Sequence, residues 1–279
     1  MKKIVLTGAA GNLGSHLREP LTKMCDELLS TDIAEDVGTL YPGETYVKAD
    51  LAEMDQIAPL MEGADMVVHF GAIVDEAPFE VLLGPNYIGS YNIWEAGYRA
   101  GVRRVVYASS IHAVGMQPKQ TNIGIDADHR PDGFYGLAKC FTEDLAKMYW
   151  DKRGMESVHL RILSCTKEPS NARALGSWLS YDDCIHLVTR AIDTPTTGFS
   201  VIYGVSNNDR APVDNTAAAY LGYRPKDNAE AYAAKLLAEE GPGDPTDIAQ
   251  MYHGGPFAAV KIGESGLAQM KIISEKKTT

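Results

Sequence analysis

Apolar residues gather in short, nearly continuous runs along the first 160 residues, and longer amphipathic segments separate these runs. The runs predict strands at 2–8, 27–32, 45–51, 64–72, 103–110 and 156–163. Strands that lack polar alternation are typical of a sheet covered on both faces.

The segments between the strands predict helices, among them 12–24, 86–101 and 134–154. Strand–helix alternation of this kind indicates a doubly wound parallel sheet in an α/β protein. Past residue 164 the pattern loosens into a predicted helix at 181–193, a predicted strand at 199–206 and many Pro, Gly, Asn and Asp residues.

We therefore expect a cofactor-binding core over residues 1–163, which includes the helix at 134–154. We expect a mixed segment over 164–279 that completes the core and forms a small substrate lobe. The tail after residue 242 is rich in loop-forming residues, and it is expected to wrap the body or to contact a neighbouring subunit of a homo-oligomer.

Composition narrows the class of protein further. The net charge of -11 argues against nucleic acid and anionic membranes as partners, because both select a basic surface. No stretch approaches the about 18 apolar residues of a membrane span, and the apolar run at the N-terminus is too short for a signal peptide. The four cysteines are far apart and form no CxxC pair, so we expect reduced thiols in a cytoplasmic protein.

The first predicted strand runs into the sequence GAAGNLG, which places Gly8, Gly11 and Gly14 between a strand and a helix. Glycines at these positions allow a tight turn and a close approach of a pyrophosphate to the helix N-terminus. Asp32 ends the second predicted strand, where a carboxylate can bind the ribose hydroxyls of NAD and repel the phosphate of NADP. Alternatively, Asp32 caps only the following turn. The pattern indicates a Rossmann-type fold with NAD as cofactor.

Further cofactor contacts are expected in the first helical turn and near the strand ends: Asn12, Leu13, Ile33, Asp50, Leu51, Phe70, Gly71, Ala72, Ile73 and Ile162. We expect no metal site.

Tyr135 and Lys139 are four residues apart in the predicted helix at 134–154, so both side chains lie on one helical face. A nearby ammonium is expected to lower the pKa of a phenol from about 10 toward neutrality, which makes the tyrosine a general base. An isolated YxxxK pattern is more often an ordinary amphipathic helix. Here Ser109 and Ser110 end the fifth predicted strand, where a hydroxyl can hold the substrate oxygen.

Together the glycine pattern, Asp32, the strand-end serine and YxxxK resemble the extended short-chain dehydrogenase/reductase family. Within it, the segments SSIHAVG, RPDGFYGLAKCF, RILSCTKEPSNARALGSWLSYDD and GYRPKDNAEAY are similar to those of uronate dehydrogenases. The resemblance implies NAD-dependent oxidation of glucuronate and galacturonate at C1 to aldaric acid lactones. It implies catalytic roles for Ser110, Tyr135 and Lys139.

The resemblance also implies a sugar pocket lined by His112, Ser164 and Arg173, and it places Asn86 near the site, among the cofactor contacts. Two positions depart from the family pattern, because Ile111 stands where Asn is frequent and Val74 stands where Ser is frequent. Each departure is expected to remove one side-chain hydrogen bond to the sugar.

Without the resemblance, the residues identify the substrate less clearly than they identify the cofactor. Arg173 follows a strand end, where a guanidinium can pair with a carboxylate, but it can equally be a surface arginine. His112 alone is more often structural.

A sugar-nucleotide epimerase or dehydratase is the nearest alternative. Ile111 and His112 stand where dehydratases usually carry an acidic pair, and the segment after Ser164 is short for a nucleotide-sugar lobe. A non-catalytic dinucleotide sensor is a second alternative, which the Tyr135–Lys139 pair disfavours.

Overall fold

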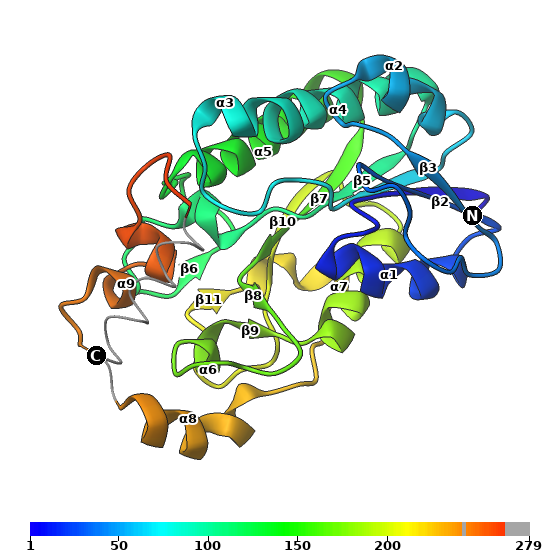
Figure 1. Ribbon diagram of the computed structural model, residues 1–279. Helices are drawn as coiled ribbons and strands as arrows, with labels where there is room; N and C mark the ends of the chain where they lie inside the picture. Colours follow the sequence, from blue (N-terminus) through cyan, green and yellow to red (C-terminus); the bar gives the residue numbers. More distant parts are fainter. Residues whose placement is uncertain (242–243, 266–279) are drawn as a thin grey trace.

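The computed structural model describes residues 1–241 and 244–265. Its centre is a parallel sheet of order β10-β7-β5-β4-β1-β2-β3, with helices on both faces (Figure 1). The strands are β1 (Lys3–Thr7), β2 (Glu27–Asp32), β3 (Glu44–Lys48), β4 (Met66–His69), β5 (Arg104–Tyr107), β7 (Glu156–Ile162) and β10 (Phe199–Gly204). This confirms the predicted α/β fold.

Alternate residues of the central strands belong to different cores. On one face, Ile4 and Leu6 of β1 pack with Leu17 of α1 (Asn12–Thr22) and Leu187 of α7 (Tyr181–Asp193). On the other face, Val5 packs with residues of α4 (Gly89–Ala100) and α5 (Phe134–Arg153). Burial on both faces explains the apolar centres of β1, β4 and β5, whereas β3 at the edge of the sheet is largely exposed.

The smaller elements surround the sheet or build the lobe below it in Figure 1. The helices are α2 (Met54–Ile57), α3 (Phe79–Leu82), α6 (Ala174–Ser177), α8 (Ala233–Glu240) and α9 (Ile248–Met251). Two strand pairs are β6 (Ile123–Gly124) with β11 (Val213–Asp214), and β8 (Ser164–Cys165) with β9 (Trp178–Leu179). Five 3₁₀ turns lie at Ala58–Met61, Ile111–Val114, Thr216–Leu221, Ala229–Tyr232 and Gly255–Ala259.

Three predicted strands were too long at their carboxyl ends. β3, β4 and β5 each stop three residues before the predicted ranges 45–51, 64–72 and 103–110 end. The surplus residues leave the sheet and form the loops of a cleft, so their apolar character reflects that lining rather than strand pairing. The predicted helix at 86–101 also differs, because its first turn belongs to a π-helix over Leu83–Ile88.

The chain after residue 163 contributes β10 and α7 to the core, and we keep the division at residue 163 as a proposal. The described part of the tail lies along the body, where Gly254 N–H donates to Gly115 O at 2.8 Å. Residues 242–243 and 266–279 of the predicted tail lie outside the described residues. Within the described ranges, the structure contains no helix that is both long and apolar enough to cross a membrane.

Candidate active site

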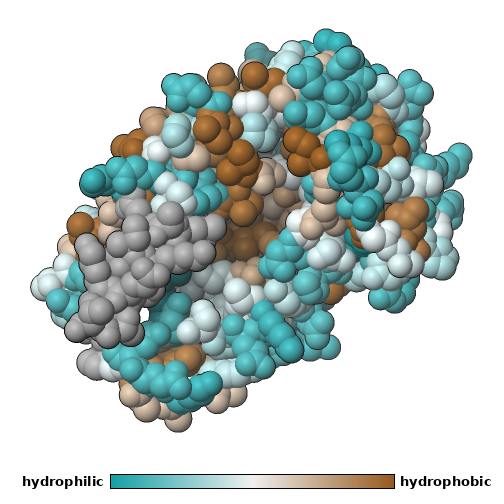
Figure 2. Space-filling model, viewed as in Figure 1, coloured by the Kyte–Doolittle hydropathy of each residue, from teal (hydrophilic) through white to brown (hydrophobic). Residues whose placement is uncertain are grey.

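A cleft of about 1100 Å³ opens at the carboxyl ends of the strands. It crosses the boundary between β1 and β4, where the strand order reverses, which is the usual ligand position in doubly wound sheets. Figure 2 shows this face hollowed, with hydrophobic atoms inside the hollow and along one rim.

The glycine turn after β1 forms one wall of the cleft. Gly8 has a φ of 75°, and a Cβ atom there would lie 2.5 Å from the Gly71 nitrogen. A Cβ atom on Gly14 would lie 1.9 Å from the Gly8 oxygen. The following helix α1 has no side-chain cap and no acidic residue in its first turn. Its N-terminal N–H groups therefore remain available to an anion such as a pyrophosphate.

Asp32 both caps a turn and lines the cleft. One carboxylate oxygen accepts from the Ala10 N–H at 3.0 Å, and the other accepts from the Ala34 N–H at 3.2 Å. The two sequence interpretations of Asp32 are thus compatible, because each oxygen keeps capacity for another hydrogen bond.

The cleft brings together all of the predicted cofactor residues except Asn86. Asn86 is buried behind the loop after β4, where its amide accepts from Ile73 N–H and donates to Ile73 O, both at 2.9 Å. The Asn86 side chain therefore fixes the loop that lines the cleft. Asn86 itself belongs to the π-helix that also contains Pro85. A local π-helix is frequent at functional sites.

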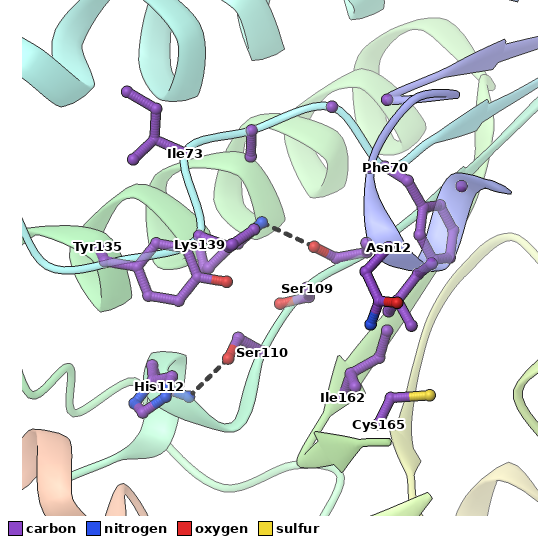
Figure 3. Close-up of a pocket in the computed structure, with 18 of the residues that line it drawn as sticks. Asn12, Phe70, Ile73, Ser109, Ser110, His112, Tyr135, Lys139, Ile162 and Cys165 are labelled. Carbon is purple, nitrogen blue, oxygen red and sulfur yellow. Dashed lines mark hydrogen bonds between the residues drawn. The ribbon is translucent and has the colours of Figure 1, made fainter. Parts of the chain in front are cut away.

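Tyr135 and Lys139 point from α5 toward the same part of the cleft as Ser110 (Figure 3). The Lys139 ammonium donates to Ala108 O at 2.7 Å and lies 5.3 Å from the centre of the Tyr135 ring. A hydrogen bond from Ser110 lowers the pKa of the Tyr135 phenol.

The expected fall in the pKa of Tyr135 is wrong for the protein alone. Burial outweighs the contribution of Ser110 and raises the pKa of Tyr135 to about 12. The same burial lowers the pKa of Lys139 to about 7. Removal of water disfavours the charged form of both groups, so adjacency in the helix is not sufficient to ionise the phenol.

Ser109 is engaged away from the substrate side. Its hydroxyl donates to Glu143, which also pairs with Arg161 at 2.8 Å and with His129 at 2.9 Å. Of the two predicted serines, Ser110 is therefore the one whose hydroxyl faces Tyr135. The Glu143 charge also raises the pKa of Lys139, although burial has the larger effect.

The start of α5 is capped by a carboxylate that is distant in sequence. Glu76 is buried and accepts from the N–H groups of Phe134 at 3.0 Å and Tyr135 at 2.9 Å. It also accepts from Gly263 N–H in the tail at 2.9 Å. One side chain therefore fixes both the N-terminus of α5 and the tail.

Arg173 lines the cleft, as does Ser164, and the Ser177 hydroxyl lies 3.5 Å from both side chains. Its guanidinium donates to His253 O at 2.9 Å, and among the described residues no ion pair joins it to a carboxylate. Burial lowers the pKa of Arg173, and the nearby Asp132 partly offsets this effect. The arginine is part of the cleft wall and not a freely solvated surface residue.

His112 lies between two aromatic rings, with ring-centre distances of 4.3 Å to Phe257 and 5.6 Å to Tyr135. Its Nδ1 lies 2.6 Å from an oxygen of Asp132. Phe257 comes from the tail and closes this end of the cleft.

The two departures from the family pattern have different surroundings. Ile111 is among the residues that line the cleft, but it is 1% exposed and packs in an apolar cluster with Val114, Ile123 and Tyr203, so its side chain mainly fills the core. Val74 is 65% exposed at the cleft.

Several cleft residues were missed by the sequence analysis: Thr7, Ala10, Thr31, Ala49, Val81, Pro85, Ala108, Leu163, Cys165, Thr166, Asn171, Gly254, Pro256 and Phe257. Those that lie at or just after strand ends could have been found from the rule that ligands bind at the carboxyl ends of parallel strands. The tail residues had no such signal.

The described residues contain no group of three or more His, Cys, Asp or Glu side chains suited to a metal ion.

Comparisons with known proteins agree with this geometry. The model of the NAD dependent epimerase/dehydratase family matches residues 4–166. The chain is 41% identical to a uronate dehydrogenase of Pseudomonas putida, over 92% of this chain and 95% of that protein. It is 42% identical to a uronate dehydrogenase of Agrobacterium fabrum, over 92% and 97% of the two chains.

Solved structures give the same result. A mutated uronate dehydrogenase superposes with a TM-score of 0.91 at 38% identity, over 97% of both chains. A mutant uronate dehydrogenase of Agrobacterium tumefaciens in complex with NAD has a TM-score of 0.89 at 41% identity, over 94% of this chain and 98% of that chain.

The buried ammonium of Lys139 makes a measurable prediction about stability. Burial lowers the pKa of Lys139 from 10.5, its ordinary value and the one expected in the unfolded chain, to about 7 in the folded protein. Between these two pH values the unfolded chain therefore holds a proton that the folded protein has lost. Stability therefore rises with pH across this window, by up to about 1.4 kcal/mol per pH unit. In urea unfolding from pH 7 to 9, Lys139→Met should flatten this rise, whereas the exposed-site variant Lys147→Met should keep it. Parallel curves for wild type and Lys139→Met would contradict the assignment.

Proposed function

Because the chain belongs to the NAD dependent epimerase/dehydratase family, and within it to the uronate dehydrogenases, we propose that it oxidises uronic acids at C1 with NAD. The products are aldaric acid lactones, and the substrates are D-glucuronate and D-galacturonate. One observation carries the choice of substrate: a cleft with the Tyr135–Lys139 pair also holds a guanidinium, Arg173, that has no ion-pair partner among the described residues.

The dinucleotide half of the cleft fits NAD. The open N-terminus of α1 suits the pyrophosphate, and the Asp32 carboxylate suits a ribose with two free hydroxyls. The negative charge of Asp32 disfavours the additional phosphate of NADP. When bound, NAD supplies the hydride acceptor and a positively charged ring that favours ionisation of a nearby phenol.

Tyr135 and Ser110 are the groups that we assign to the reacting hydroxyl. Ser110 donates a hydrogen bond to the C1 oxygen, and Tyr135 as phenolate takes the proton from that oxygen. Loss of the C1 hydrogen as hydride then completes the C1 carbonyl. Because the ring oxygen stays bonded to C1, the first product is a lactone.

Lys139 has a supporting role in this proposal. Its ammonium would stabilise the phenolate of Tyr135 and hold the nicotinamide ribose. The burial that depresses its pKa also strengthens its electrostatic effect on Tyr135 when it is charged.

The sugar half of the cleft provides polar groups and one aromatic face. Arg173 pairs with the C6 carboxylate, Ser164 and His112 bind sugar hydroxyls, and Phe257 packs against the apolar face of the ring. Val74 lies at the cleft but offers no hydrogen bond. Ile111 is turned toward the core, so we expect its effect on sugar binding to be indirect.

A sugar-nucleotide epimerase of the same family is the alternative function. An epimerase regenerates NAD in each cycle and makes no net NADH. Absorbance at the NADH band on mixing the protein, NAD and glucuronate therefore separates the two activities.

We further propose that the protein forms a homo-oligomer in the cytoplasm. Its four cysteines are all free thiols, as expected in a reducing compartment. α4 and α5 pack side by side (Figure 1) and carry exposed apolar residues at helical spacing. On α5 these are Leu137, Phe141 and Met148, and α4 carries Tyr91 and Tyr98. A two-fold axis through this surface would pair it with its own copy.

Light scattering at micromolar concentration tests this surface. Wild type should have the mass of at least a dimer, and Met148→Glu should shift it toward the monomer because a charge is then buried in the contact. Leu40→Glu, at an exposed apolar position elsewhere, is the control. A monomeric wild type would refute the oligomer.

Replacement of the proposed base tests the mechanism. Tyr135→Phe should lower kcat roughly 10²- to 10⁴-fold, the usual range for loss of a general base. Tyr220→Phe removes the hydroxyl of a half-exposed tyrosine outside the cleft, together with its hydrogen bond to Ser200, and should retain wild-type turnover. Near-normal turnover in Tyr135→Phe would exclude Tyr135 as the base.

Replacement of the arginine tests the substrate class. A charge-assisted pair contributes about 1.5–3 kcal/mol, so Arg173→Met should lower kcat/KM on glucuronate roughly 10- to 200-fold. Activity on glucose should change little, because glucose has no carboxylate. Arg210→Met, which removes an exposed arginine paired with Glu230, is the matched control. If the ratio of glucuronate to glucose efficiency is the same in wild type and Arg173→Met, another residue binds the carboxylate.

A further inference from the structure

The His112–Asp132 contact joins the sugar half of the cleft to a buried carboxylate. Nδ1 of His112 lies 2.6 Å from an Asp132 oxygen, and the two side chains are 14% and 1% exposed. The sequence analysis did not single out Asp132, which lies in the loop before α5.

The backbone around Asp132 is shaped to its carboxylate. Cβ atoms on Gly115 and Gly254 would lie 2.1 and 2.0 Å from one Asp132 oxygen, and a Cβ atom on Gly136 would lie 3.0 Å from the other. These glycines belong to three separate segments, one of them in the tail. The carboxylate is therefore held in a fixed position that a larger side chain could not occupy.

This geometry determines which ring nitrogen of His112 carries the proton. An ionised carboxylate only accepts hydrogen bonds, so the Nδ1 beside it must be the donor. In the neutral ring, Nε2 is then an acceptor. His112 lines the cleft, and its Nε2 has no hydrogen-bond partner among the described residues.

We propose that Asp132 is a positioning residue that holds His112 in the Nδ1-protonated form, so that Nε2 accepts a hydrogen bond from a sugar hydroxyl. The inference rests on the proposed function, because it concerns the same sugar pocket. The rings of Phe257 and Tyr135 contact the imidazole, and the Asp132 carboxylate determines which ring nitrogen faces it. Without Asp132 either nitrogen of the neutral His112 ring could carry the proton. With Asp132 the nitrogen that faces the cleft is an acceptor, so the ring binds a group that donates a hydrogen bond, such as a hydroxyl.

Asp132 also lies near Arg173: burial lowers the pKa of that guanidinium, and the Asp132 charge partly offsets the fall, so two other roles must be separated from this one. The carboxylate could act on the substrate through Arg173, or it could only brace the surrounding loops. Either role would be independent of the imidazole of His112.

A double-mutant cycle separates these roles. Asp132→Asn keeps the shape of the side chain but loses the charge, and it can turn either an oxygen or an NH₂ toward Nδ1. This change should lower kcat/KM for glucuronate roughly 10-fold, mainly through KM, with the Kd of NAD unchanged. In the His112→Ala background the same change should have an effect below about twofold, because coupled residues are non-additive. Equal effects in both backgrounds would overturn the proposal.

The ¹⁵N spectrum of protein labelled at histidine provides a test that needs no substrate. The His112 signals are identified by their loss in His112→Gln. At about pH 8.5 wild type should show a protonated Nδ1 and an unprotonated Nε2, and Asp132→Asn should lose this fixed pattern. A ring protonated at Nε2, alone or with Nδ1, would overturn the proposal. If wild type forms no NADH from any uronate, the proposed function fails, and this spectrum still decides the role of Asp132.

Discussion

Exclusion of water from the floor of the cleft is the constraint on which its chemistry depends. The same burial raises the pKa of Tyr135 to about 12 and lowers the pKa of Lys139 to about 7. A phenol and an ammonium in this environment both favour their neutral forms, so each needs a charged neighbour to become reactive. The Glu143 carboxylate supplies such a charge to Lys139. That carboxylate is held in turn by ion pairs with Arg161 and His129. The floor of the cleft is thus a buried environment in which Glu143, Arg161 and His129 partner one another.

The buried arginines of the protein also have defined partners, and the exception lies in the proposed sugar pocket. Arg18, Arg104 and Arg161 are almost completely buried, and they pair with Glu44, Glu156 and Glu143 respectively. These pairs fasten helices and loops to the sheet, as when Arg104 also donates to the carbonyls at the end of α7. Among the described residues, Arg173 is withdrawn into a cleft wall without such a partner. Its fixed charge is therefore available to an anionic ligand.

The features that the sequence could predict are those that depend on residues close together in the chain. The glycine turn at Gly8 and the Tyr135–Lys139 face depend on backbone geometry within a few residues, so their spacing is visible in the chain. Glu76, Asp132 and Phe257 act on partners that are brought near only by folding, and no local pattern indicates them. The direction of the Tyr135 pKa was mispredicted for a related reason. Burial depends on the whole fold, whereas the proximity of two side chains depends on one helix.

The position of Phe257 late in the chain has a consequence for the order in which the site is completed during synthesis. The strands and helices that surround the cofactor half end at Gly204, so that half can assemble once about three quarters of the chain has been made. The proposed sugar half is complete only after the tail has been made. Phe257 and Gly263, whose N–H donates a hydrogen bond to Glu76, come more than 50 residues after Gly204. A nascent chain can therefore become competent to bind dinucleotide before it can recognise a sugar.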